Sequence, residues 1–191
     1  MRDPLAGLPE QARERAVAAE QPSWTDPMLA TLTDRRFSDP GWVFEPKLDG
    51  ERCLAFRKGP QVRLLSRIRK RRNDHYSELA EALAAQEADD FVVDGEVVAF
   101  EGGRRSSFAR LQRRMQLADA EAARRSGVAV YLYLFDVLHV HGHDVTRLGL
   151  RQRKAVLRRL LVFRDPLRFT PHRNADGEAY WREACRKGWE G

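Results

Sequence analysis

Clusters of apolar residues, separated by polar and turn-forming residues, divide the chain into short strands and amphipathic helices. Apolar, aromatic and β-branched runs predict strands at residues 43–47, 52–57, 62–66 and 128–138. Runs at 91–93 and 97–100 predict two strands or one bent strand. Apolar residues at helical spacing predict helices over 76–86, over 150–161 and across Phe108, Leu111 and Met115, the last capped by Ser106 or Ser107. Because no regular βαβ period is present, we expect an α+β fold with two-layer antiparallel sheets and flanking helices.

The N-terminal segment differs in composition from the rest of the chain. Residues 1–22 are polar and rich in Ala, Glu and Arg, with at most a helix over 9–20 that lacks a strong apolar stripe. We expect this segment to be a mobile leader. Repeated prolines between Pro22 and Gly41 then indicate a loop with brief turns. The remaining residues, 23–191, are expected to form one domain.

Composition and charge narrow the class of protein. The 191 residues are 42% hydrophobic and 32% charged, which is typical of a globular domain. No run is long enough to span a membrane and no signal peptide is evident, so we expect a cytoplasmic protein. Cys53 and Cys185 form no metal or disulfide pattern, and both are expected to be reduced. The net charge of +6 favours a polyanionic partner.

The positive charge is concentrated in residues 67–72. This run reads Arg-Ile-Arg-Lys-Arg-Arg and therefore carries five cations in six positions. It predicts either contact with nucleic-acid phosphates or a solvated basic loop. The residues we expect at a DNA surface are Arg69, Lys70, Arg71 and Arg72.

The segment Glu45-Pro46-Lys47-Leu48-Asp49-Gly50-Glu51-Arg52 contains the strongest candidate for chemistry. It lies between two predicted strands, and Asp-Gly favours a turn in which glycine supplies a positive φ. A lysine becomes a nucleophile when burial or a nearby cation disfavours its ammonium form, and Arg52 is such a cation. Lys47 could then form a Schiff base or a phosphoramidate. An ordinary solvated lysine fits the segment equally well.

Acidic and aromatic residues supply candidates for the rest of a site. Glu96 follows a glycine at a predicted strand break and could bind a ribose hydroxyl or Mg²⁺, or lie in solvent. Asp94 is interpreted as a turn residue, and Glu190 as a second metal carboxylate. Phe135 could stack on a base, although its spacing favours a core position. Three alternating histidines, at 139, 141 and 143, favour a polar hairpin over a metal site.

Together these segments resemble the adenylation domain of ATP-dependent DNA ligases, within the covalent nucleotidyltransferase superfamily. The resemblance is closest to bacterial ligases of repair and end joining. It runs from Pro27 to the C-terminus. The matching motifs, in the family's order, are K-x-D-G-x-R at 47–52, S-R at 66–67, D-G-E at 94–96, F-x-x-L-Q-x-R at 108–114 and F-D-x-L at 135–138.

The resemblance implies both a fold and a three-step reaction. The fold would be the ATP-grasp-like nucleotidyltransferase domain, acting with ATP and Mg²⁺ or Mn²⁺ on nicked double-stranded DNA, as a monomer. Lys47 would take AMP from ATP, pass it to the 5′-phosphate of the nick, and the 3′-hydroxyl would displace it. By resemblance, Glu96 would bind ribose and support metal, and Phe135 would stack on adenine. Arg52 and Arg67 would contact sugar and phosphates, while Glu45 and Pro46 would shape the adenine pocket through their backbone.

The chain departs from the family pattern at its end. The family follows an E-G motif with an apolar strand, a K-x-K element and an OB-fold domain, whereas this sequence stops at Glu190-Gly191. We therefore expect a C-terminally incomplete adenylation domain, without an OB-fold, whose ligation is impaired. Two alternatives stay open. One is a catalytically inactive nucleic-acid-binding remnant, and the other is an RNA ligase or capping-type nucleotidyltransferase.

Overall fold

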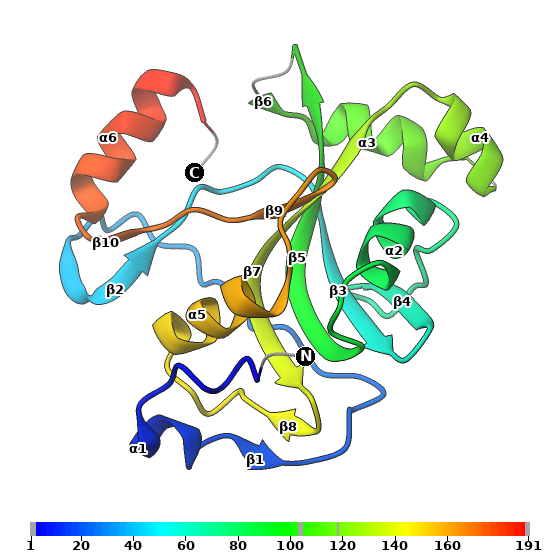
Figure 1. Cartoon of the computed structure of the whole chain (residues 1–191). Helices are drawn as coiled ribbons and strands as arrows, with labels where there is room; N and C mark the ends of the chain where they lie inside the picture. Colours follow the sequence, from blue (N-terminus) through cyan, green and yellow to red (C-terminus); the bar gives the residue numbers. More distant parts are fainter. Residues whose placement is uncertain (1–2, 103–104, 118, 190–191) are drawn as a thin grey trace.

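The computed structural model describes residues 3–102, 105–117 and 119–189 and has an α+β fold (Figure 1). The strands are β1 (Val17–Ala18), β2 (Asp39–Phe44), β3 (Glu51–Lys58), β4 (Gln61–Ser66), β5 (Asp90–Glu101), β6 (Arg105–Ser106), β7 (Val130–Val140), β8 (His143–Asp144), β9 (Leu167–Phe169) and β10 (Arg173–Ala175). The helices are α1 (Glu10–Arg13), α2 (Ser77–Ala84), α3 (Phe108–Met115), α4 (Ala120–Arg125), α5 (Leu150–Leu160) and α6 (Gly177–Lys187). Most of the predicted elements are present within a few residues of their expected bounds.

Two sheets organise the fold. The larger sheet has the order β1-β8-β7-β5-β3-β4, with β6 on β5 and β9 on β7. Its pairs are antiparallel except for the parallel pair β7–β9, and β2 and β10 form a separate antiparallel ribbon. Strand β5 is continuous through residues 94–96, with a register shift against β7 between Asp94 and Gly95. The alternative of one bent strand is therefore confirmed.

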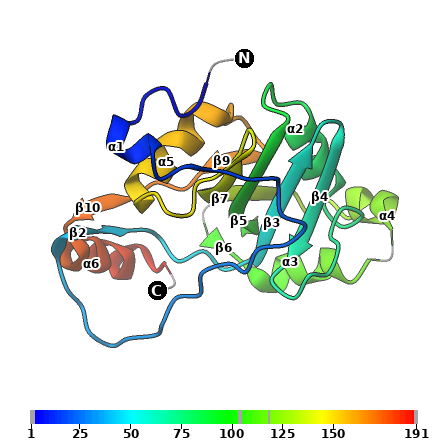
Figure 2. The same cartoon turned by 90° about the horizontal axis from the view of Figure 1, so that it is seen from below.

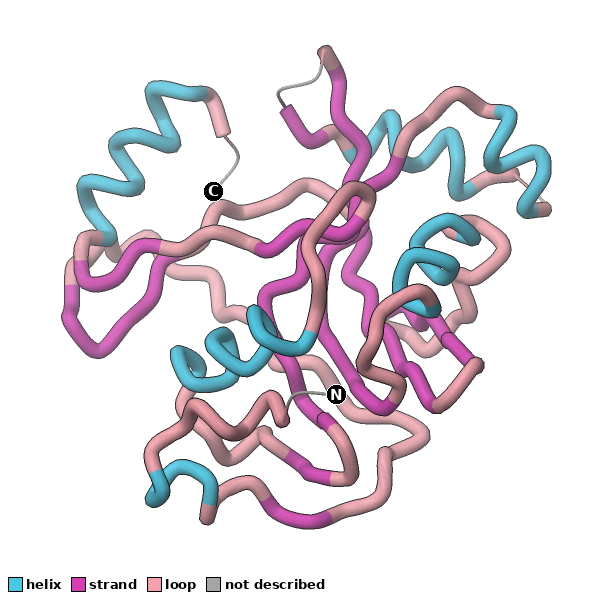
Figure 3. The backbone as a smooth tube through the Cα atoms, in the orientation of Figure 1, coloured by secondary structure: helices cyan, strands magenta, loops and turns pink. Residues whose placement is uncertain are grey.

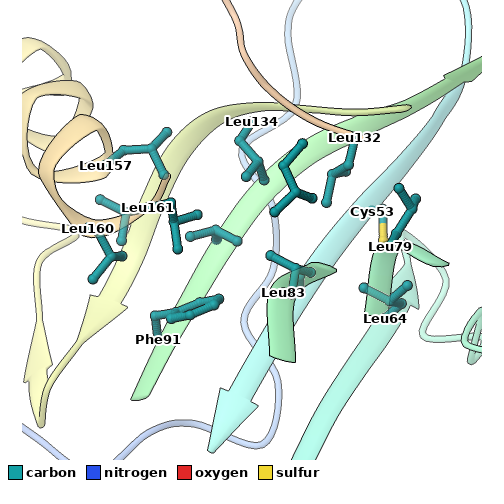
Figure 4. Close-up of a cluster of buried hydrophobic side chains, with 14 of the residues drawn as sticks. Cys53, Leu64, Leu79, Leu83, Phe91, Leu132, Leu134, Leu157, Leu160 and Leu161 are labelled. Atoms are coloured by element: carbon teal, nitrogen blue, oxygen red, sulfur yellow. The ribbon is translucent and has the colours of Figure 1, made fainter. Parts of the chain in front are cut away.

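One face of the large sheet carries the main core. Alternate residues of β5 and β7, such as Val93 and Leu132, point into a buried cluster that α2 and α5 cover. Figure 4 shows Leu157 and Leu160 on one side of this cluster and Leu79 and Leu83 on the other, over the central strands. Because successive side chains of a strand point to opposite faces, the intervening residues lie on the other face. That second face has only a small apolar cluster, which leaves room for a polar site.

The N-terminal segment packs on the domain, which differs from the expected mobile leader. Leu8 and Ala12 are buried in the main core, and Val17–Ala18 pairs with β8. The Gln21 side chain donates hydrogen bonds to the Arg57 carbonyl and the Asp90 carboxylate. The expected helix over 9–20 is a single turn, Glu10–Arg13. A few apolar side chains suffice to attach this segment to the core, although they form no periodic stripe and most of residues 9–20 are exposed.

A long connection and the C-terminal elements complete the fold. No helix or strand is assigned to residues 19–38, and Figures 2 and 3 show this loop sweeping out before it enters β2. Helix α6, which the sequence pattern did not predict, packs on β2. Gly177 is required there, because a Cβ would lie 2.3 Å from the Phe37 carbonyl oxygen. Among the described residues, no helix is long and apolar enough to cross a membrane.

Candidate active site

Lys47 lies on the segment that connects the two sheets. Strand β2 ends at Phe44 and pairs with β10, whereas β3 begins at Glu51 and pairs with β4 and β5. The two strands predicted on either side of Lys47 are present, but they belong to different sheets and do not pair with each other. The lysine is exposed at the point where the chain crosses between them.

Gly50 is needed for a close approach rather than for a turn. It is absent from the glycines with positive φ, contrary to the sequence prediction. A Cβ at this position would lie 2.1 Å from the Val97 carbonyl oxygen of β5. The absence of a side chain at Gly50 thus lets the segment that carries Lys47 pass directly against the backbone of β5.

Asp49 attaches the same segment to the start of α3. Its carboxylate accepts a hydrogen bond from the Phe108 backbone N–H at 2.8 Å, and its own N–H donates to the Ser106 hydroxyl at 3.1 Å. Ser107 caps the helix by accepting from the Arg110 N–H at 3.3 Å. The prediction of a serine cap is confirmed, and the cap region also fixes the nucleophile's loop.

A pocket of about 470 Å³ opens beside Lys47. Its walls combine the 46–49 segment with aromatic side chains from β5, from β7, from α6 and from the residues that follow α6. These aromatic residues are Phe100, Tyr133, Tyr180 and Trp189. The pocket offers an amine next to flat apolar surfaces, an arrangement suited to a nucleoside phosphate.

Arg52 and Asp94 form a buried pair on the face of the sheet opposite the main core. The Arg52 guanidinium donates to both Asp94 carboxylate oxygens at 2.6 Å, and the Asp94 side chain is 3% exposed. Asp94 is therefore a mid-strand ion-pair partner, and its interpretation as a turn residue is wrong. The guanidinium also lies 4.6 Å from the Phe135 ring centre. Since Asp94 holds it, Arg52 acts as an anchored contact rather than a mobile cation beside Lys47.

Glu96 lies opposite Arg52 in the register of β3 and β5 and is half-buried. Burial raises the pKa of its carboxyl to about 7, with a further rise from Asp94 and Glu51, while Arg52 and Lys47 act in the opposite direction. Glu96 is not in a hairpin in solvent. A carboxylate that burial makes costly to ionise is well suited to a bound cation, which stabilises the charged form.

Of the two predicted metal carboxylates, Glu96 and Glu190, the described residues include Glu96. Across the described ranges, no group of three or more His, Cys, Asp or Glu is arranged to hold a metal ion. A Mg²⁺ site that uses one or two carboxylates and substrate phosphate oxygens fits Glu96. Glu190 lies outside the described residues. His139 is buried, and its Nε2 lies 3.1 Å from the Ala19 carbonyl oxygen, as expected for a structural histidine.

Lys154 is a site residue that the sequence reasoning missed. Its Nζ lies 2.5 Å from the Glu45 carboxylate and donates to the Phe135 carbonyl at 3.0 Å, and the side chain is 2% exposed. Burial raises the pKa of Glu45, against the effect of Lys154. A lysine on the apolar stripe of Leu150 and Leu157 was the signal available in the sequence.

Phe135 occupies the open face of the sheet, not the core. It is half-buried, with Arg52 against its ring. The following residue, Asp136, accepts two hydrogen bonds from Arg153 of α5 at 2.7 and 2.8 Å. Helix α5 therefore holds the Phe-Asp segment through two adjacent cations, Arg153 and Lys154. Arg52 lies against the Phe135 ring and opposite Glu96, and Lys47 acts electrostatically on Glu96. Lys47 lines the pocket, whereas Arg52, Glu96 and Phe135 lie outside its described lining.

The basic run divides into exposed and structural residues. Arg67, Arg69, Lys70 and Arg71 are exposed. Arg72, in contrast, lies 2.6 Å from the Glu51 carboxylate with its side chain 16% exposed, and Tyr76 donates to the same carboxylate. Arg72 is therefore also part of the scaffold, unlike the exposed Arg69, Lys70 and Arg71, and its contact with DNA stays a prediction. Arg69 lies over the Trp24 ring at 4.9 Å.

Comparison with known proteins relates this geometry to a family. The family described as "ATP dependent DNA ligase domain" matches residues 27–191. A probable DNA ligase of Streptomyces avermitilis is 34% identical over 154 residues, covering 77% of this chain and 30% of that protein. The multifunctional non-homologous end joining protein LigD of Pseudomonas aeruginosa is 30% identical over 188 residues, covering 97% of this chain and 21% of that protein. The chain thus spans less than a third of these relatives.

Two solved structures of DNA ligases have a fold similar to that of this chain. A mycobacterial DNA ligase D complexed with ATP and MES has a TM-score of 0.65 and 26% identity, covering 86% of this chain and 52% of that chain. The ligase domain of LigD from M. tuberculosis has a TM-score of 0.62 and 26% identity over 78% of this chain and 46% of its own. The motifs, the fold and the family match agree, and the chain belongs to the ATP-dependent DNA ligase domain family.

Proposed function

We propose that this domain carries out the nucleotidyl-transfer chemistry of an ATP-dependent DNA ligase, with Lys47 as the residue that accepts AMP. The observation that carries the proposal is the position of Lys47, which lines the pocket and interacts electrostatically with Glu96. Arg52 and Phe135 lie on the same open face. An amine, an acid and an aromatic surface thus face one region.

In the first step, the neutral amine of Lys47 attacks the α-phosphorus of ATP. The bond from nitrogen to phosphorus forms as the bond from that phosphorus to the bridging oxygen breaks. Pyrophosphate leaves, and the proton released by the nitrogen passes to solvent. Because little acid–base chemistry is required, the protein contributes mainly by positioning the groups and offsetting phosphate charge.

The surrounding residues would position the nucleotide. Adenine stacks on the face of the Phe135 ring that Arg52 leaves open, and Arg52 also contacts the sugar. Arg67 reaches the phosphates from the basic run. Glu45 and Pro46 border the base through their backbone, and Lys154 fixes both this segment and Phe135. The complex of the similar mycobacterial DNA ligase D with ATP supports nucleotide binding by this fold.

Glu96 would bind ribose and help hold Mg²⁺ or Mn²⁺, with Glu190 as a second carboxylate. When bound, the cation neutralises charge on the phosphates. The raised pKa of Glu96 supports this role, because a nearby cation favours the ionised carboxylate.

The later steps involve nicked double-stranded DNA. The 5′-phosphate attacks the adenylyl phosphorus, which frees Lys47, and the 3′-hydroxyl then attacks the 5′-phosphorus and releases AMP. Arg69, Lys70 and Arg71 would contact the duplex, since they are exposed. The name of one relative, a non-homologous end joining protein, supports a role in strand repair. The monomeric state and cytoplasmic location remain predictions.

The test uses ATP labelled at the α-phosphate, Mg²⁺ and denaturing electrophoresis. We expect covalent label in the wild-type chain and in Lys58→Ala, which removes another exposed lysine, but none in Lys47→Arg or Lys47→Ala. Release of the label on addition of nicked DNA, but not nicked RNA, supports the DNA substrate. Absence of label from the wild-type chain, with DNA binding retained, would favour the inactive nucleic-acid-binding alternative.

A further inference from the structure

A second hollow lies between α3 and α4, separate from the pocket at Lys47. It has a volume of about 460 Å³ and combines an apolar floor with three arginines. The arginines are Arg110, Arg113 and Arg125, and the floor includes Leu117, Ala122 and Val128. Figure 1 shows α3 and α4 next to each other beside the end of the large sheet.

The arginines of these two helices serve two different purposes. Arg114 is 2% exposed and donates to the His75 and Val128 carbonyls and to Glu78, so it fixes α3 to the domain. Arg124 likewise pairs with Glu81 of α2. These two arginines attach α3 and α4 to the rest of the domain. The arginines that line the hollow, in contrast, form no ion pair with another helix or strand in the described part of the chain.

The hollow itself contains little opposing charge. Helix α3 has no acidic residue, and within the described part of the chain no ion pair involves Arg110 or Arg113. Arg125 pairs with Glu121 on its own helix, where both side chains are more than 70% exposed, at 71% and 75%. Such exposed pairs contribute little and exchange readily. The hollow therefore presents at least two guanidinium groups that have no acidic partner among the residues the structure describes.

The position of α3 relates this hollow to the nucleophile. The helix starts at Phe108, whose N–H donates to Asp49, two residues after Lys47. Its eight residues, Phe108–Met115, extend for about 12 Å at roughly 1.5 Å per residue. One strand of duplex DNA carries a phosphate about every 3.4 Å along the axis. With its axis parallel to α3, the duplex would therefore place about three or four phosphates of the strand that starts at Lys47 along the length of the helix, and the two arginines could contact about two of them.

We infer that the α3–α4 hollow binds the phosphodiester backbone of the duplex beside the nick. The inference rests on the proposed function, because it assumes that the reacting phosphate lies at Lys47. Arginine presents a planar fork that matches phosphate oxygens in bidentate fashion. The overall charge of +6 and the lack of acidic residues on α3 favour a polyanion. The hydrogen bond that ties the start of α3 to Asp49, two residues after Lys47, favours the duplex that reacts at Lys47 over an acidic peptide. Arg113 is exposed and Arg110 half-buried, so both are accessible to such a ligand.

The test is the double variant Arg110→Gln/Arg113→Gln of the full chain. Binding of a fluorescent nicked duplex is measured by anisotropy at several salt concentrations. Each lost phosphate contact should lower the slope of log affinity against log salt by about 0.9, and we expect a total decrease near 2. Affinity at moderate salt should fall about tenfold. Arg15→Gln/Arg164→Gln, which removes the same charge from exposed positions elsewhere, should change the slope by less than half as much.

The outcomes separate this inference from the proposed function. Lysyl-AMP formation without DNA should be unchanged in the Arg110→Gln/Arg113→Gln variant, since that step needs no duplex. If the wild-type chain forms no lysyl-AMP but the variant loses duplex binding, the proposed function fails and the surface assignment stands. A salt slope equal to that of the wild-type chain would overturn the inference. So would absence of duplex binding by the wild-type chain, or displacement of the duplex by poly-glutamate as readily as by unlabelled DNA.

Discussion

The pair of Lys154 and Glu45 offers the sharpest test of how the site is held together. Substituting Lys154→Met keeps the length of the side chain but removes its charge. The Glu45 carboxylate, 2.5 Å from the ammonium, and the Phe135 carbonyl, 3.0 Å away, both lose their partner. Because the lysine is only 2% exposed, water cannot readily replace it. Breaking a buried ion pair from one side costs about 3–5 kcal/mol, and we expect a loss of stability in that range.

Removing the stranded charge should recover much of this loss. The double variant Lys154→Met/Glu45→Gln leaves a neutral pair, so we expect it to be more stable than Lys154→Met by about 2 kcal/mol or more. The assay is urea unfolding followed by tryptophan fluorescence. Lys58→Met, at an exposed position, is the control and should change stability by less than about 0.5 kcal/mol.

The pH dependence gives an independent check. Burial raises the pKa of Glu45 in the folded state, and loss of Lys154 raises it further. The folded state then holds the proton more tightly than the unfolded state, so stability falls as pH rises above the ordinary glutamate pKa. The cost of Lys154→Met should be smaller at pH 4 than at pH 8. If Lys154→Met lowers stability by less than about 1 kcal/mol, or if the double variant recovers none of the loss, then the ion pair of Lys154 and Glu45 does not stabilise the site.

Three further variants test other contacts by the same unfolding assay, together with the ATP-labelling assay for Gly50→Ala. In metal-free protein, Glu96→Gln should gain about 3 kcal/mol of stability over the wild-type chain between pH 4 and pH 8. A carboxyl whose pKa is raised from 4.5 to about 7 loses its stabilising contribution as pH rises through that window, and an equal difference at both pH values would contradict this. Gly50→Ala places a Cβ 2.1 Å from a backbone oxygen, so it should abolish lysyl-AMP formation and lower stability by about 1–3 kcal/mol, whereas Gly142→Ala, in open space at φ +75°, should keep activity. Arg114→Met should cost about 3 kcal/mol because it leaves three acceptors unpaired, and exposed Arg113→Met almost nothing; similar losses in both would be inconsistent with the assignment of Arg114 as a scaffold residue.

Much of the fold could be predicted from the sequence because the long strands and helices have strong apolar patterns. Strand β7 and helix α2 are examples, since their buried residues recur at the expected spacing. The patterns failed where burial depends on a few side chains. Strand β1 has two residues, and helix α6 buries only Gly177 and Tyr180, so neither has a readable period.

The candidate site could be predicted in its members but not in its contacts. Motif order pointed to Lys47, Glu96 and Phe135, yet nothing in the chain order shows that β5 lies between β3 and β7. That order, with its register, places Arg52 opposite Glu96 and allows the pair with Asp94. Contacts from helices are equally hidden. The apolar stripe around Lys154 indicates that it is buried, but its contacts with Glu45 and Phe135 follow only from the packing of α5 on the sheet.

The proposed function requires that AMP be transferred to the side chain of Lys47. After incubation with ATP and Mg²⁺, the chain can be digested under mildly alkaline conditions that preserve a phosphoramidate, and the adduct located by tandem mass spectrometry. We predict AMP on Lys47, no adduct in Lys47→Arg, and a full level of adduct in Lys58→Ala. AMP on any other lysine, or an adduct that persists in Lys47→Arg, would show that Lys47 is not the acceptor.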